Sequence, residues 1–131
     1  MNFILTLHGE IRWLVALVGA IAIIKFAIGW LTSQPYAKFD RALMSGFTIL
    51  MDINLLLGLI LLFFLGGGFP RYRLEHAFIM ILAVIVAHLS IRWRNDPDPA
   101  RIFRNNLFVT VIALALVFLG VIMLRGGWIF G

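Results

Sequence analysis

The stretch RALMSGFTILMDINLLLGLILLFFL occupies residues 41–65 and carries only two charged side chains, Arg41 and Asp52. At a rise of about 1.5 Å per residue, a helix of this length crosses the hydrocarbon core of a bilayer, which is about 30 Å thick. The run is too continuous for an alternating barrel strand, and a backbone in lipid must satisfy its own hydrogen bonds. Residues 41–65 therefore predict a membrane-spanning helix.

Three further segments have the same character: residues 12–32, 74–93 and 106–124. Of the 131 residues, 63% are hydrophobic and 13% are charged, and the mean hydropathy is +1.04. This composition excludes a disordered chain, a coiled coil and an ordinary soluble enzyme. The predicted fold class is all-α: an integral membrane four-helix bundle, up-down-up-down, that forms one domain over residues 1–131.

Turn-forming residues separate the four predicted spans. Pro35 follows the first span, and residues 66–70, GGGFP, follow the second. Glycine accepts the left-handed backbone at the end of a helix, and proline cannot continue one. Asp98 followed by Pro99 predicts an N-cap and the first position of a short interfacial helix ahead of the fourth span.

The basic residues lie in loops between apolar runs, so we expect them to set topology and contact anionic lipid rather than nucleic acid. We call side A the membrane surface at which the chain begins, and side B the opposite surface. Side A carries Arg12, Arg71, Arg73 and Arg125, and side B carries Lys38, Arg41, Arg92, Arg94, Arg101 and Arg104. The excess on side B predicts that side B is cytoplasmic and that both termini are outside.

Polar side chains recur inside the apolar segments, where an ionisable group is costly and is a candidate functional residue. Spacings of four, three and four residues place one stripe on a single helix face: Arg41, Ser45, Thr48 and Asp52. Lys25 and His88 fall in the same half of the bilayer. The predicted intramembrane polar cluster therefore comprises Lys25, Ser45, Thr48, Asp52 and His88.

Three interpretations of this cluster stay open. A Lys25–Asp52 ion pair would fix the register of two helices, and losing one partner would leave an uncompensated charge. Alternatively, Asp52 carries protons along a path with Lys25 and His88, as in a small proton or solute conductor. The third interpretation is contact with a helix of another protein.

A second cluster lies at side A, where the first and third spans both begin. His8 and His76 fall at comparable depth, and two histidines on separate helices are the axial ligands that a b-type haem requires. A quinone headgroup site, a docking site, or ordinary interfacial hydrogen bonds and ion pairs are the alternatives. The charged members of this interfacial cluster are Glu10, Arg12, Arg71, Arg73 and Glu75.

Other chemistry is absent from the sequence. The chain has no cysteine, which excludes disulfides, thiolate metal sites, Fe–S clusters and a covalently attached haem. No glycine-rich loop leads from a strand into a helix, the serines lack a base–acid arrangement, and three scattered histidines do not make a zinc site. We therefore expect no enzyme activity, no catalytic residue and no metal site.

Several short motifs carry a resemblance that spans most of the chain: Leu7-His8, Arg12-Trp13, Asp52-x-Asn54-x-x-x-Gly58, Glu75-His76 and His88. On these motifs the chain resembles a family of small bacterial four-helix membrane proteins, some of which are labelled cytochrome b-like. Residues 71–76 and 104–106 are similar to variants from filamentous phototrophic bacteria. The resemblance implies a bacterial inner membrane location and an accessory subunit of an alternative complex III-like assembly.

The expected function is a non-catalytic membrane subunit that packs against a larger quinol-oxidising or photosynthetic electron-transfer complex. Its expected partners are the lipid bilayer and the larger membrane subunits of that complex. The first alternative is a stand-alone redox protein that binds a b-type haem or a quinone at His8 and His76. The second alternative is the proton or solute conductor that uses Lys25, Asp52 and His88.

Overall fold

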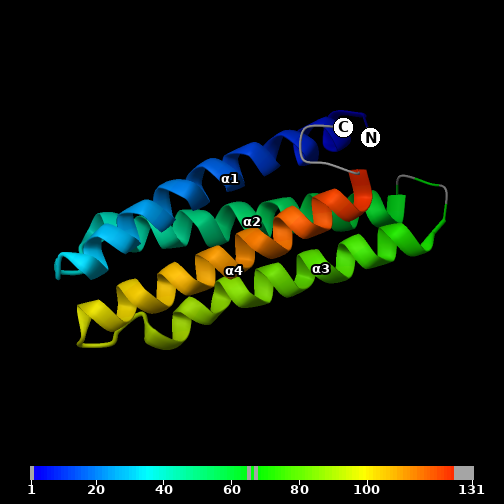
Figure 1. The fold of residues 1–131 in the computed structure, drawn as a ribbon. Helices are drawn as coiled ribbons and strands as arrows, with labels where there is room; N and C mark the ends of the chain where they lie inside the picture. Colours follow the sequence, from blue (N-terminus) through cyan, green and yellow to red (C-terminus); the bar gives the residue numbers. More distant parts are fainter. Residues whose placement is uncertain (1, 65, 67, 126–131) are drawn as a thin grey trace.

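A computed structural model describes residues 2–64, 66 and 68–125, and that part of the chain is helical without strands (Figure 1). Its elements are α1 (Asn2–Leu31), α2 (Lys38–Phe64), α3 (Arg71–His88), the 3-10 helix η1 (Leu89–Trp93) and α4 (Pro99–Arg125). Four helical segments are long and apolar enough to cross a membrane, with η1 continuing α3. The predicted all-α four-helix bundle is confirmed, and the four segments indicate a multi-pass membrane protein.

The helices form a four-cornered bundle in which successive helices run antiparallel (Figure 1). α1 packs against α2 and α4, and α3 packs against the same two helices, so α1 and α3 are diagonal to each other. α1 begins and α4 ends at one end of the bundle, which is side A. Side A therefore brings together the beginnings of α1 and α3 with the ends of α2 and α4.

The observed helices extend beyond the predicted spans. α1 begins at residue 2 rather than 12, α2 at 38 rather than 41, α3 at 71 rather than 74, and α4 at 99 rather than 106. A hydropathy criterion stops at the first polar turn, whereas a helix continues while its backbone remains hydrogen-bonded. The separate interfacial helix predicted ahead of the fourth span was wrong, because α4 is continuous. The predicted placement of the C-terminus concerns residues 126–131, which lie outside the described residues.

The interior of the bundle is apolar and closely packed. The side chains of Phe26, Phe47 and Phe103 are fully buried. Glycine permits a close contact between α1 and α4, since a Cβ on Gly29 would lie 2.5 Å from Cε1 of Phe103. Close backbone approach at small residues is the usual source of packing energy between helices in membranes.

Most of the apolar surface faces outward rather than into this core. Within the most apolar window of each span, the buried share runs from 11% in α3 to 39% in α4. Large apolar side chains such as Phe3, Leu31 and Phe64 are at least 70% exposed. In water such a surface would drive aggregation; in a bilayer it contacts lipid chains or another membrane subunit.

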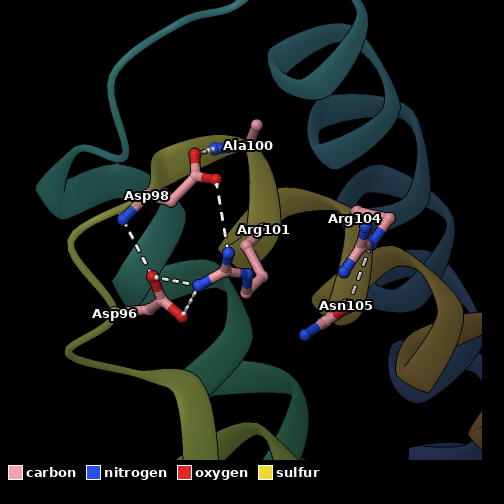
Figure 2. A network of polar contacts seen from close by, with 6 residues as sticks. All are labelled: Asp96, Asp98, Ala100, Arg101, Arg104 and Asn105. Carbon is pink, nitrogen blue, oxygen red and sulfur yellow. Dashed lines mark hydrogen bonds and ion pairs between the residues drawn. The ribbon is translucent and has the colours of Figure 1, made fainter.

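An acidic turn starts α4 (Figure 2). Asp98 accepts a hydrogen bond from the Ala100 N–H at 3.1 Å while Pro99 takes the first helical position, so the predicted N-cap is confirmed. Asp96 accepts the Asp98 N–H at 2.8 Å and pairs with Arg101 at 3.0 Å. The backbone hydrogen bond first, and Arg101 second, lower the pKa of Asp96 from its ordinary value.

Replacing the cap, Asp98→Ala, should destabilise the start of α4 by about 1 kcal/mol, because the Ala100 N–H loses its acceptor. Hydrogen exchange of the amides of residues 100–104 in detergent micelles measures the effect. Asp98→Asn is the matched control, since asparagine also caps helices, and should exchange nearly as slowly as the native chain. Equal protection in all three proteins would show that the cap does not stabilise this turn.

Candidate functional site

A cavity of about 270 Å³ lies inside the side-A end of the bundle, and all four helices line it. We call it the histidine cavity. Apolar side chains such as Val15, Met51 and Val117 form most of its wall. Its polar and charged lining residues are His8, Arg12, Asn54, Tyr72, Arg73 and His76. An apolar wall with a few convergent polar groups is the usual composition of a ligand site.

The two histidines, which the sequence placed at comparable depth, come together at this cavity. The ring centres of His8 on α1 and His76 on α3 are 6.5 Å apart, and the ring planes are nearly perpendicular at 88°. The extension of α1 to residue 2 places His8 within the helix rather than in a loop outside it. Diagonal helices that both begin at side A therefore present one imidazole each to the same cavity.

Each imidazole lies beside a glycine on a neighbouring helix. Nδ1 of His76 lies 2.8 Å from the carbonyl oxygen of Gly120 on α4, so Nδ1–H donates and the lone pair of the ring is on Nε2. Metal-binding histidines commonly have this outer hydrogen bond to a carbonyl. A Cβ on Gly58 would lie 3.0 Å from Cε1 of His8, so glycine lets α2 accommodate that ring.

The charged lining residues of the histidine cavity are all basic. Arg12 is 91% buried, donates a hydrogen bond to the Gly9 carbonyl, and lies 5.1 Å from the centre of the Trp13 ring. Arg73 donates hydrogen bonds to the carbonyls of Gly66 and Gly68 in the turn between α2 and α3. The cavity therefore suits a ligand that combines an apolar ring with anionic groups.

The predicted interfacial cluster of five charged residues does not form as one unit. Arg71 and Glu75 pair with each other on the surface of α3 at 2.8 Å. Glu10 is exposed on α1 and joins no ion pair in the described part of the chain. Only Arg12 and Arg73 of this set line the histidine cavity. The spacing along the helices placed these residues at one depth but could not specify their directions.

The polar stripe on α2 forms a second cavity of about 230 Å³, which we call the Asp52 cavity. Its lining includes all four predicted members of the stripe, Arg41, Ser45, Thr48 and Asp52. Across it, Nε2 of His88 lies 2.7 Å from Oδ1 of Asp52. The predicted single face of α2 is confirmed, and the structure shows that His88, predicted only to lie in the same half of the bilayer, contacts Asp52 directly. Asn54, two residues further along α2, lines the histidine cavity instead.

The Lys25–Asp52 ion pair considered from the sequence is wrong. Nζ of Lys25 lies 2.6 Å from Oδ1 of Asp40 and donates a second hydrogen bond to Oε1 of Gln34 at 3.2 Å. Asp40 is in the first turn of α2, whereas Asp52 is twelve residues further, about 18 Å along the helix. Lys25 therefore reaches towards side B, and the predicted intramembrane cluster divides into two separate pairs.

Asp40 is a buried charged residue that the sequence analysis did not single out. Its side chain is 1% exposed, and Oδ2 accepts the backbone N–H of Ala37 at 2.9 Å. An acidic residue three positions after the N-cap commonly reaches back to the cap in this way. The sequence signal for this role was an acidic residue shortly after Pro35, at the start of a helix. Residue 40 lies outside the apolar run, so a search within the run does not include it.

A second set of polar side chains that the sequence analysis did not predict joins three segments of the chain at side B. Nε1 of Trp93 donates to Oδ1 of Asn106 at 2.7 Å, and Nδ2 of Asn106 donates to the hydroxyl of Tyr36 at 3.0 Å. Burial first, and Asp40 second, raise the pKa of Tyr36, which lies in the turn between α1 and α2. An asparagine that follows Asn105 at the start of an apolar run carries no signal that identifies such distant partners.

Comparison with known proteins adds no identity: no family model, no curated protein and no solved structure matches the chain. Within the described residues there is also no group of three or more histidine, cysteine or acidic residues that could hold a metal ion. The functional argument therefore rests on the two cavities and on the polar side chains that line them.

Removing the Lys25 partner, Asp40→Asn, should lower the free energy of unfolding by about 3 kcal/mol, because it leaves a partly buried ammonium without its counter-charge. Glu75→Gln is the matched control on an exposed pair and should cost less than about 1 kcal/mol. Unfolding in detergent at increasing denaturant, followed by circular dichroism, compares the two. A larger loss in Asp52→Asn than in Asp40→Asn would contradict the observed pairing of Lys25.

Proposed function

We propose that the protein is a small membrane electron carrier that holds a b-type haem between His8 and His76. The supporting observation is the separation of the two imidazole rings, 6.5 Å between their centres. One imidazole from each of two diagonal helices at a shared cavity is the ligand set that a b-type haem would use, so the positions of α1 and α3 support this proposal.

The residues around the histidines fit the rest of this group. The apolar wall suits the macrocycle, and Arg12 and Arg73 provide positive charge for its two carboxylates. A quinone headgroup would accept hydrogen bonds through its carbonyl oxygens but has no carboxylate to pair with the two arginines. Met51 and Met80 also line the cavity, and their flexible side chains would let its wall adapt to a large ring.

When bound, the haem supplies one-electron transfer, and the chain itself contributes orientation and electrostatics. The Gly120 carbonyl orients the His76 ring through Nδ1, which makes Nε2 the ring atom that would bind a metal. Arg12 and Arg73 place positive charge near the cavity, which favours the reduced state of a bound redox centre. We therefore expect an electron carrier without a catalytic residue.

The second candidate is the accessory role in a larger electron-transfer complex of the bacterial inner membrane, with side B cytoplasmic and both termini outside. The exterior of α3 favours it, since only 11% of its most apolar window is buried inside the bundle. A broad apolar face of this kind suits packing against larger membrane subunits as well as lipid. The two candidates are compatible, because carrier subunits are themselves components of such complexes.

Purified in mild detergent from a haem-supplied host, the protein should show a Soret band and stoichiometric haem. His76→Ala and His8→Ala should each lose most of the absorbance, since each removes an axial ligand. His88→Ala is the matched control, because His88 lies in the other cavity, and it should retain the band. Absence of the band from the folded native protein, or its equal loss in His88→Ala, would rule out the proposed site.

Purification from native membranes tests the accessory role. Larger redox subunits should co-migrate with the chain on native gels and be identified by mass spectrometry of the same fraction. Substitution of exposed α3 residues, such as Phe78→Ala with Ile85→Ala, should weaken this association while the bundle remains folded. A chain that purifies alone under every mild condition contradicts the accessory role but leaves the haem proposal intact.

A further inference from the structure

The Asp52 cavity holds an ionisable pair deep in the membrane-spanning part of the bundle. Asp52 lies fourteen residues after the start of α2, which is about 21 Å along the helix. Its side chain is 45% exposed and that of His88 is 41% exposed. Ionisable side chains at such depth are usually enclosed by the bundle. This pair is instead accessible from the outer face of the seam between α2 and α3.

Both members of the pair retain hydrogen-bonding capacity. Within the described part of the chain, the only side-chain hydrogen bond of either residue joins Nε2 of His88 to Oδ1 of Asp52. With Asp52 ionised, Nε2–H donates, so Oδ2 of Asp52 and Nδ1 of a neutral His88 are both acceptors. The pair therefore matches a ligand that donates hydrogen bonds.

The remaining walls of the cavity suit one flat ring. Apolar side chains of Met44, Ile49 and Ile91 line it, and its volume is about 230 Å³. The hydroxyl of Thr48 donates to the Ser45 carbonyl at 2.9 Å, so its oxygen can accept a further hydrogen bond. The positive groups of the lining, Arg41 and Arg94, belong to the beginning of α2 and to the turn after η1.

The depth of Asp52 in the membrane restricts which bilayer-soluble ligands can reach it. A phospholipid headgroup is charged and stays at the interface, whereas Asp52 is near the middle of its span. A ligand that reaches it must have a neutral polar head on an apolar body and must carry hydroxyl donors. We propose that the Asp52 cavity binds a lipid-soluble hydroquinone, with one ring hydroxyl donating to Asp52 or His88. This is a second site, distinct from the proposed haem site, and the proposal concerns binding only.

The experiment uses the full chain in nanodiscs and a short-chain azido-hydroquinone, kept reduced by anaerobic handling. After irradiation, mass spectrometry should locate the label within residues 41–52 or 88–94, and excess unmodified hydroquinone should compete with it. Asp52→Asn should reduce the competed labelling about tenfold, the loss expected for a hydrogen bond to a charged group, and His88→Gln, which removes a neutral acceptor, should reduce it by a smaller factor. Glu75→Gln, an exposed carboxylate on α3, is the matched control and should label like the native chain.

Circular dichroism and gel filtration show whether each variant remains folded, and the conservative pair Asp52→Glu with His88→Asn provides a second test if either single variant unfolds. His76→Ala should keep the labelling, which separates this site from the haem site and makes the two proposals fail independently. Competed label around His8 and His76, label that spreads over the lipid-facing surface without competition, or labelling unchanged in the folded variants would overturn the proposal.

Discussion

The structure depends on the requirement that polar groups in hydrocarbon find partners within the chain, because no water is present to hydrogen-bond with them. The backbone meets this requirement through four helices that leave few residues outside. The side chains meet it through a small number of pairs, of which Lys25–Asp40 and Asp52–His88 are the ionisable ones in the described part of the membrane-spanning helices. Each pair joins two elements, so satisfying the polar groups also sets how the helices are placed.

The two ends of the bundle use this constraint differently. At side B, Asp40 joins α1 to α2, and Asn106 joins α4 to Tyr36 and Trp93. The polar atoms of these residues therefore hydrogen-bond between elements of the bundle. At side A, His8 and His76 face a cavity whose wall is apolar and whose charged lining is basic. The side-B end is therefore joined by hydrogen bonds between elements beside the Asp52 cavity, whereas the side-A end surrounds the histidine cavity.

The two cavities along the contact between α2 and α3 differ in how they would hold a ligand. The histidine cavity is lined by all four helices and suits a ligand retained inside the bundle, whereas the Asp52 cavity exposes its ionisable pair on the outer face. Gly58 and Asp52 lie six residues apart on α2, about 9 Å along the helix. A retained redox group and an exchangeable hydroquinone would therefore sit close enough to belong to one electron-transfer process, which connects the two proposals without making either depend on the other.

The amino-acid sequence by itself determined the number of helices long and apolar enough to span a membrane, their alternation, and the end of the bundle near which each polar residue lies, because helix length and hydropathy are local properties of the chain. It also predicted the shared face of the α2 stripe and the N-cap at Asp98, both of which follow from helical periodicity and short-range hydrogen bonding. Only the tertiary structure decided that Lys25 pairs with Asp40, that Asp52 pairs with His88, and that the rings of His8 and His76 meet in one cavity. Partner choice depends on the rotation of each helix about its axis, and close packing at contacts such as Gly29 against Phe103 sets that rotation.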